Sequence, residues 1–418
     1  MDPSTDARVL SLFEAYGIEL EYMVVDRESL SVVPAADSLL ETAAGEATTE
    51  FERGDFAWNN ELARHVIEFK TNGPSASLDG LADGFAGEVR YANELLAVAG
   101  RQLMPTGMHP WMDPATELQL WDQDDREIYE TFDRIFSCKG HGWANLQSMH
   151  LNLPFSSDEQ FGRLHAAIRF LLPIMPGLTA SSPLMDGRLS GLRDTRLAVY
   201  RNNCARVPSV TGMIVPEAVY SRGEYEQRIL QRIYADLEPL DPAGILRHEW
   251  ANARGAIARF DRMALEIRVL DTQECPAIDI AYARVIIAAL QALCEEKWCT
   301  LPELQSWETD ELARAFAAVA ERAERTEISR RAYLNALGIP RSSASVHEIW
   351  GHLADRAAEA GALDRPAETA LEHYLGRGSL STRIVAALPA EPGLDDLRRV
   401  YRRLCTCLET GHSFRADE

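Results

Sequence analysis

Two glutamates, Glu19 and Glu21, lie two residues apart in residues 17–22 (GIELEY), where apolar and charged residues alternate. This period of two predicts a β-strand with one apolar and one polar face. Alternate side chains of a strand point the same way and lie about 6.6 Å apart. The two carboxylates therefore share one face with no cation between them. Such a face is either a solvated sheet surface or part of a cation-binding site.

Three later segments repeat this pattern, with an apolar face opposite a face that carries an acid or an imidazole. They centre on Glu68 in residues 66–70, on His150 in residues 148–152, and on Glu266 with Arg268 in residues 265–269. If the four strands share one sheet, these groups meet on one surface. Like charges about 4 Å apart repel by roughly 4 kcal/mol at an effective dielectric near 20, so gathered carboxylates favour a bound cation. Carboxylate-rich ligation suits Mg²⁺ or Mn²⁺ better than zinc. Four independent strands with solvent-facing glutamates are the alternative.

Composition limits the classes of partner. The chain has 418 residues with 46% apolar and 25% charged residues, as in a globular protein with a large core. Its formal net charge of −22 argues against nucleic acid and against an anionic membrane as partners. Lysine occurs only at Lys70, Lys139 and Lys297, so phosphate contacts must come mainly from arginine, backbone or metal.

The N-terminus and the cysteines indicate a cytoplasmic protein. Residues 1–6 are acidic and lack an apolar stretch, which predicts no signal peptide, and residues 1–16 are expected to form a short helical lead-in. Apolar runs such as residues 285–290 are too short to span a bilayer. The seven cysteines are odd in number and lack zinc-site spacing, so we expect reduced thiols.

The remaining pattern predicts an α+β fold. The strands alternate cleanly instead of forming continuous apolar runs, which suits an antiparallel sheet with one polar face. A further short strand is expected at residues 30–33, and helix and irregular loop at residues 35–57. The predicted helices cover residues 78–99, 124–137, 157–172, 192–202, 221–237, 278–295 and most of 302–418. We expect a core of residues 1–300 and a mostly helical C-terminal portion, residues 301–418, packed on that core.

The ordered set of segments resembles the glutamate–cysteine ligase family, most closely its second type, the carboxylate–amine ligases. The resemblance covers about residues 15–300 in consistent order, and more weakly the helical tail. It rests on residues 16–21 (YGIELE), 61–62 (EL), 66–71 (VIEFKT), 180–184 (ASSPL), 187–188 (GR), 198–201 (AVYR) and 262–271 (RMALEIRVLD). It implies a glutamine-synthetase-like fold, in which a curved, mainly antiparallel sheet flanked by helices forms an active-site funnel.

The resemblance also implies roles for individual residues. The groups that would bind or adjoin metal are Glu19, Glu21, Glu61, Glu68, His150 and Glu266. Arg268 would contact the transferred phosphoryl group and, with Glu266, act in catalysis. Arg201 and Arg188 are candidates for binding nucleotide phosphates or the substrate carboxylate.

Three positions depart from a simple pattern. Glu61 lies seven residues before Glu68, so strand parity separates them unless the chain bends between them. Gln147 falls off the His150 face and is left out of the site. Ser148 stands where the family has a second histidine.

The implied activity is ligation that depends on ATP and on Mg²⁺ or Mn²⁺. A glutamate-like carboxylate would be joined to a cysteine-like amine through an acyl phosphate, with release of ADP and phosphate, as in glutathione biosynthesis. The partners would be small molecules, and a homodimer is compatible with this reading. A metal-dependent amide hydrolase that activates water, and a non-catalytic homologue that binds nucleotide or metabolite, are the alternatives. ADP release in the presence of amino acids separates the three.

Overall fold

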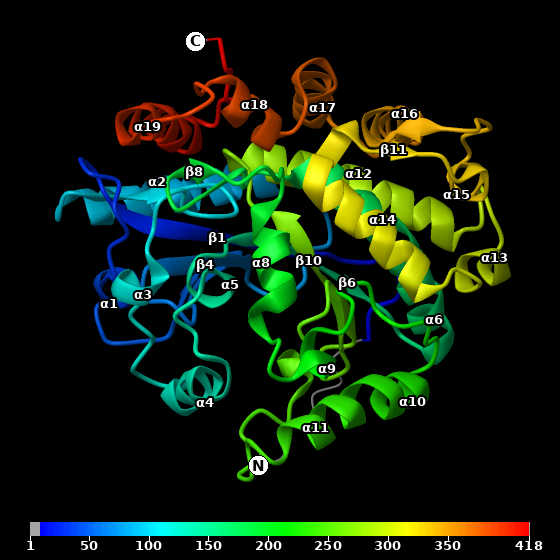
Figure 1. Ribbon diagram of the computed structural model, residues 1–418, viewed down its shortest axis with the longest axis horizontal. Coiled ribbons are helices and arrows are strands. Elements are labelled where there is room, and N and C mark those ends of the chain that lie inside the picture. Colours follow the sequence, from blue (N-terminus) through cyan, green and yellow to red (C-terminus); the bar gives the residue numbers. More distant parts are fainter. Residues whose placement is uncertain (1–8, 418) are drawn as a thin grey trace.

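The computed structural model describes residues 9–417, which are arranged around an eight-stranded sheet (Figure 1). The strand order is β2-β3-β4-β1-β6-β10-β9, with β5 paired to the end of β1, and every pairing is antiparallel. The strands are β1 (Gly17–Asp26), β2 (Glu50–Arg53), β3 (Phe56–Asn60), β4 (Val66–Thr71), β5 (Arg101–Met104), β6 (Ser148–Pro154), β9 (Ala256–Arg259) and β10 (Ala264–Asp271). Two separate two-stranded sheets pair β7 (Leu184–Met185) with β8 (Arg188–Leu189) and β11 (Glu327–Ile328) with β12 (Ala344–Ser345). The predicted α+β class with a mainly antiparallel sheet is confirmed.

The four strands predicted to carry chemistry are neighbours in this sheet. In the register of β1, Glu19 is opposite His150 of β6, and Glu21 is opposite Glu68 of β4. On the far side of β6, Glu266 of β10 is opposite Asn152. A register shift between Ile267 and Leu270 interrupts this last pairing, and such bulges bend a strand and redirect its side chains.

The apolar face of the sheet forms the main core. Ile18, Leu20 and Tyr22 of β1 are fully buried there, as the alternation predicts. Three long helices pack over this core: α2 (Leu81–Ala97), α6 (Asp158–Leu171) and α12 (Pro276–Cys294). The other α-helices before residue 300 are α1 (Ala36–Ala44), α3 (Pro114–Glu117), α4 (Arg126–Phe136), α5 (His141–Ala144), α7 (Met175–Thr179), α8 (Thr195–Asn203), α9 (Pro208–Thr211), α10 (Arg222–Tyr225) and α11 (Gln231–Leu237). Two single turns of 3-10 helix, η1 (Leu172–Ile174) and η3 (Glu249–Ala251), and a π-helix, η2 (Glu226–Leu230), complete this part of the chain.

Helix α12 contains the apolar run at residues 285–290 and is longer than that run suggests. An 18-residue stretch of this 19-residue helix has a mean hydropathy of 1.7, so by length and composition alone it passes as a membrane span. The fold gives it another role, because 83% of this stretch is buried inside the protein. It packs between α2, α6, α16 and α17, as a core helix does.

The chain after residue 300 is mostly helical, as predicted, and lies along one side of the molecule (Figure 1, yellow to red). Its elements are α13 (Leu301–Gln305), α14 (Thr309–Arg322), η4 (Ala323–Arg325), α15 (Arg331–Asn335), α16 (Val346–Glu359), α17 (Arg365–Arg377), α18 (Leu380–Ala386) and α19 (Leu394–Thr410). Buried residues of α14, α16 and α17 belong to the same hydrophobic cluster as the sheet. A boundary at residue 300 stays a prediction.

Three local expectations differ from the structure. The expected helical lead-in is not seen, because residues 9–16 form a turn and no helix. The prediction of no signal peptide concerns residues 1–6, which lie outside the described residues. Residues 30–33 make only a single bridge, Val25 to Val32, because the Asp26 carboxylate accepts hydrogen bonds from the Ser29 backbone and hydroxyl and closes a turn. Residues 50–57, part of the segment expected as helix and irregular loop, belong to the β2–β3 hairpin around Gly54, which has a positive φ of 65°.

Candidate active site

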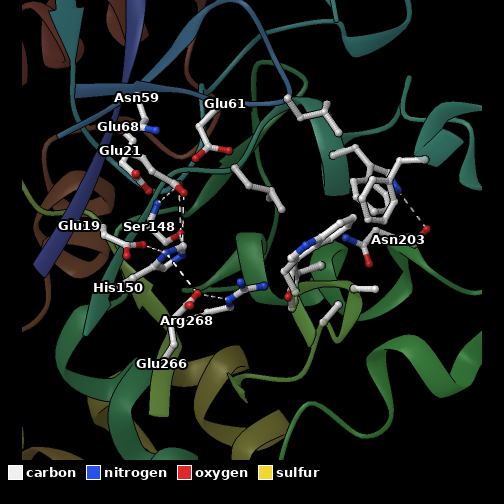
Figure 2. Close-up of a pocket in the computed structure, with 18 of the residues that line it drawn as sticks. Glu19, Glu21, Asn59, Glu61, Glu68, Ser148, His150, Asn203, Glu266 and Arg268 are labelled. Atoms are coloured by element: carbon white, nitrogen blue, oxygen red, sulfur yellow. Dashed lines mark hydrogen bonds and ion pairs between the residues drawn. The ribbon is translucent and has the colours of Figure 1, made fainter. Parts of the chain in front are cut away.

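A cavity of about 460 Å³ lies over the polar face of the sheet. All seven residues predicted to form the central cluster line it, namely Glu19, Glu21, Glu61, Glu68, His150, Glu266 and Arg268 (Figure 2). The alternative of solvent-facing glutamates is wrong, because Glu21, Glu68 and Glu266 are only 7%, 9% and 2% exposed. The four strands form one acidic wall instead of four separate wet surfaces.

His150 lies at the centre of this acidic wall. Its Nδ1 donates a hydrogen bond to Glu19 Oε2 at 2.7 Å and is 3.8 Å from Glu266 Oε1. Its Nε2 is 2.9 Å from Ser148 Oγ and 3.8 Å from Glu21 Oε1. The imidazole therefore separates two groups of carboxylates, one on each side of the ring.

Both groups of carboxylates have the chemistry of a divalent-cation site. Glu19, His150 and Glu266 place one ligand atom each within 4.8 Å of the others, and so do Glu21, Glu68 and His150. Carboxylate oxygens with one imidazole suit Mg²⁺ or Mn²⁺. The residues present therefore fit the ion that the sequence predicts.

Negative charge exceeds positive charge around Glu61 and Glu68. Burial and the nearby charges of Glu21 and Glu19 raise the pKa of Glu61 to about 8. Burial and the same neighbours raise the pKa of Glu68 well above its ordinary value. A cation bound here would replace the protons that these two carboxyl groups otherwise hold near neutral pH.

Glu19 and His150 behave in the opposite way because they pair with each other. Burial is the largest single influence and disfavours the charged form of both, but their hydrogen bond and the neighbouring charges together outweigh it. The hydrogen bond from His150 and the charges of His150, Arg268 and Arg262 lower the pKa of Glu19 to about 2. The same hydrogen bond and the charges of Glu21, Glu19 and Glu266 raise the pKa of His150 to about 9.

Two guanidinium groups border the cluster on the β10 side. Arg268 Nε donates to Glu266 Oε1 at 2.5 Å, and Arg259 donates to Glu266 Oε2 at 3.2 Å. Arg268 lies at the register shift between Ile267 and Leu270 of β10, and its backbone N–H donates to Gly255 O at 2.9 Å. Arg259 Nε is buried without a hydrogen-bond partner among residues 9–417. The pair can bind the oxygens of a phosphate or a carboxylate.

Ser148 takes the place of a second histidine by fixing Glu21. Its backbone N–H and its hydroxyl both donate to Glu21 Oε2, at 2.6 Å and 3.0 Å. Asn152 fixes the other carboxylate of β1 in the same way, donating to Glu19 Oε1 at 3.0 Å. Gln147, left out on parity, is fully buried and does not line the cavity.

The β3–β4 connection brings in Glu61 and a residue that sequence reasoning missed. Residues 61–65 turn between the two strands, which supplies the bend that Glu61 needs to reach the cavity. Asn59 of β3 is opposite Glu68 and also lines the cavity, and its Oδ1 is buried with no partner in the described chain (Figure 2). Asn59 lies outside the segments that carry the family resemblance, so only the sheet register identifies it.

The structure does not bring Arg188 and Arg201 to this cavity. Arg188 is exposed on β8, and Arg201 is exposed on α8, where each lines a different surface hollow. Helix α8 instead presents Arg196, Tyr200 and Asn203 to the cavity, at the i, i+4 and i+7 spacing of one helical face. In the motif AVYR, the residue that reaches the site is thus the tyrosine before the arginine.

The wall opposite the acidic cluster is aromatic. It consists of Tyr129 and Phe132 of α4, Trp143 of α5, Tyr200 of α8 and Trp250 of η3. The Phe132 ring centroid lies 5.1 Å from that of Trp143 and 5.9 Å from that of Trp250. The cavity therefore combines a charged wall built by the sheet with an apolar wall built by the connecting helices.

Comparisons with known proteins cover most of the chain. The family model described as glutamate–cysteine ligase family 2 (GCS2) matches residues 15–388. An uncharacterized protein of Archaeoglobus fulgidus is 40% identical over 281 residues, which cover 67% of this chain and 75% of that protein. A Nocardioides protein named "Putative glutamate--cysteine ligase 2-1" is 27% identical over 305 residues, covering 71% of this chain and 72% of that protein.

A solved structure shares the fold. The glutamate–cysteine ligase of Francisella tularensis, crystallised in complex with AMP, superimposes with a TM-score of 0.58 at 14% identity. The superposition covers 95% of this chain and 89% of that one.

Proposed function

Because the chain belongs to glutamate–cysteine ligase family 2, a family of carbon–nitrogen ligases, we propose that it is an ATP- and Mg²⁺-dependent carboxylate–amine ligase. The carboxylate is that of glutamate or a similar amino acid, and the amine is that of cysteine or another amino acid. The products are an amide, ADP and inorganic phosphate. Mn²⁺ fits the same ligands.

One observation carries this proposal. Glutamates from three strands and one connecting turn converge with His150 and two guanidinium groups on a single cavity. A cluster of this kind, short of positive charge, suits a nucleotide that arrives with a divalent cation, because the cation supplies the missing charge and also binds phosphate oxygens. A protein of net charge −22 could otherwise hold ATP only weakly.

The reaction needs two bond exchanges in this cavity. First, an oxygen of the substrate carboxylate attacks the γ-phosphorus of ATP, which breaks the bond to the β-γ bridging oxygen and yields an acyl phosphate and ADP. The neutral amine then attacks the acyl carbon, the bond from that carbon to the phosphate oxygen breaks, and the released phosphate takes up the proton that the amine loses. Glu19, Glu21, Glu68, His150 and Glu266 would hold a divalent ion, which would supply positive charge to the phosphate oxygens of the nucleotide.

The chain's own groups position these steps. Arg268 and Arg259, both anchored on Glu266, direct N–H groups towards the transferred phosphoryl oxygens. The hydrogen bonds from Ser148 to Glu21 and from Asn152 to Glu19 hold the two β1 carboxylates in place. Preorganised donors and ligands of this kind need no rearrangement during the reaction.

The test is ADP release by the purified protein with ATP, Mg²⁺, glutamate and candidate amino acids, with the amide product identified by mass spectrometry. Glu266→Gln removes the charge that anchors both arginines, and we expect a loss of at least about 100-fold in kcat/KM. Glu94→Gln, on the exposed face of α2, is the matched control and should retain full activity. Undiminished ligation by Glu266→Gln would reject the assignment, and amide turnover without nucleotide would favour the hydrolase.

A further inference from the structure

Three rings of the aromatic wall, those of Phe132, Trp143 and Trp250, have no part in the phosphoryl-transfer steps described above. Resting on the proposed function, we infer that the amine substrate carries a bulky apolar side chain, preferably aromatic, which packs against Phe132, Trp143 and Trp250. The substrate class differs from cysteine, whose side chain is small. The inference rests on the position of the wall, its composition and one unpartnered amide oxygen.

The wall adjoins the reacting groups. The Tyr129 hydroxyl accepts a hydrogen bond from Asn60 Nδ2 at 3.2 Å, at the point where β3 leads into Glu61. Tyr200 interacts with Arg268, the arginine placed at the phosphoryl group. An amine within bonding distance of an acyl phosphate at Arg268 therefore has its side chain next to these rings. A group bound far from the chemistry could not use this surface.

The composition of the wall favours a large apolar group. Helices α4 and α5 and turn η3 contribute no charged side chain to the cavity. They contribute the rings of Tyr129, Phe132, Trp143 and Trp250, and the Trp143 indole N–H is already bonded to Asn203 O at 3.2 Å. The gain from apolar contact scales with the area removed from water, so a side chain as small as that of cysteine would leave most of these rings uncovered.

Asn203 adds one polar feature to this wall. Its Nδ2 donates to Gly142 O at 2.8 Å, and its Oδ1 is buried with no partner in the part of the chain that the structure describes. Figure 2 shows Asn203 across the cavity from Glu19, Glu21 and Glu68. A buried acceptor without a donor is costly, so Asn203 Oδ1 fits an N–H or O–H group on the ligand.

The adenine ring of ATP is the competing occupant, since it is also flat and carries an amino group. A second hollow of about 520 Å³ adjoins the cavity and shares Glu19, Lys70 and Arg262 with it. The base can occupy this hollow, with its phosphates directed to the cluster, while the aromatic wall remains free. The amine is therefore the occupant that the arrangement favours, and the experiment below distinguishes the two.

The experiment compares cysteine, alanine, leucine, phenylalanine and tryptophan as amines, with ATP, Mg²⁺ and L-glutamate, by ADP release. We expect kcat/KM for phenylalanine or tryptophan to exceed that for alanine and cysteine by at least about 10-fold, in the range that hydrophobic pockets give. Trp143→Ala and, separately, Phe132→Ala should reduce this preference to less than about 3-fold while the KM for ATP changes less than 2-fold. Trp298→Ala, whose ring lies outside the cavity, is the matched control and should keep the preference.

Each outcome bears on a different claim. A preference for cysteine or alanine would overturn this inference and leave the ligase assignment intact. A rise in the KM for ATP in both wall variants, with amine selectivity unchanged, would assign the wall to adenine and also overturn it. No ADP release with any amine would reject the proposed function itself. Calorimetric titration of phenylalanine into the protein with Mg²⁺ and ADP checks the same preference without turnover, and tighter binding of alanine than of phenylalanine would contradict the inference.

Discussion

Two groups of acidic side chains lie along strand β10, and they differ in how their charge is balanced. One is the cavity cluster described above. The other surrounds Asp271, which is fully buried at the end of β10. The Asp271 carboxylate pairs with Arg196 and accepts hydrogen bonds from the Ser181 backbone and from the Ser182 hydroxyl, each at 2.8 Å.

The comparison suggests that Asp271 stabilises the fold, whereas the carboxylates of the cavity serve a bound ligand. Around Asp271 the donors fill the space, and a Cβ on Gly107 would lie 2.5 Å from the Asp271 carboxyl carbon. In the cavity, Glu61 and Glu68 make no ion pair with any residue in 9–417, and Lys70 pairs instead with Glu50 at 2.9 Å. Arg196 thus neutralises Asp271, whereas Glu61 and Glu68 have no cationic ion-pair partner among residues 9–417 and leave the cavity cluster able to accept a cation.

The largest expected effect concerns the structural acid. Asp271→Asn leaves the Arg196 guanidinium buried without its counter-charge, and breaking a buried pair in this way costs about 3–5 kcal/mol. Urea denaturation of the metal-free protein should show this loss in the unfolding midpoint. Asp236→Asn, which breaks the exposed pair with Arg232, is the control and should leave the midpoint unchanged. A stability of Asp271→Asn equal to that of the control would remove the contrast between the two clusters.

In the cavity, removing an acidic charge should stabilise the protein instead of destabilising it, and the size of this effect depends on pH. Glu61 has an ordinary pKa of 4.5 and a pKa of about 8 in the folded protein, so its stabilising contribution is complete below pH 4.5 and is lost as pH rises to 8. In EDTA, Glu61→Gln should match the wild type near pH 4.5 and exceed it by about 1 kcal/mol or more at pH 8, since one pKa unit corresponds to about 1.4 kcal/mol.

The measurement is urea denaturation at both pH values with and without Mg²⁺. The buried histidines His65, His109 and His165 have lowered pKa values, and burial is the main cause, so they add stability as pH rises. The wild type and Glu61→Gln both contain these histidines, so their contribution cancels when the two unfolding free energies are compared. Mg²⁺ should raise the stability of the wild type more than that of the variant. A wild type more stable than Glu61→Gln at pH 8 in EDTA would mean that the cluster is already balanced.

The smallest expected effect is at the two arginines that lie outside both clusters. Arg188→Ala and Arg201→Ala each remove a guanidinium that is exposed and absent from the cavity lining. We expect kcat/KM for ATP to change less than about 2-fold, as for surface substitutions remote from a site. Arg259→Ala, which removes a guanidinium from the lining, is the positive control in the same ADP-release assay. A loss from Arg188→Ala or Arg201→Ala as large as that from Arg259→Ala would restore them to the site.

The sequence predicted those parts of the site that strand periodicity determines. Alternation places Glu19, Glu21, Glu68, His150 and Glu266 on one face, because side-chain direction in a strand follows parity. The antiparallel sheet and its buried apolar face follow from the same alternation.

What the sequence missed depends on contacts between distant segments. Asn59 enters through the register of β3 with β4, and Arg259 through the pairing of β9 with β10. On α8, the family motif points to Arg201, whereas helix rotation against β10 selects Tyr200, one residue earlier. Local periodicity cannot predict which side chain of α8 faces the cavity, because the packing of the helix against the rest of the protein determines it.

The most direct test of the central claim is calorimetric titration of ATP into the wild type and into Glu68→Gln, each in Mg²⁺ and in EDTA. The incomplete acidic cluster predicts that ATP binds the wild type at least about 10-fold more tightly with Mg²⁺ than with EDTA, a difference of about 1.4 kcal/mol. Most of this difference should disappear in Glu68→Gln and persist in the control Glu94→Gln. Equal affinity of the wild type for ATP in Mg²⁺ and in EDTA would contradict the account.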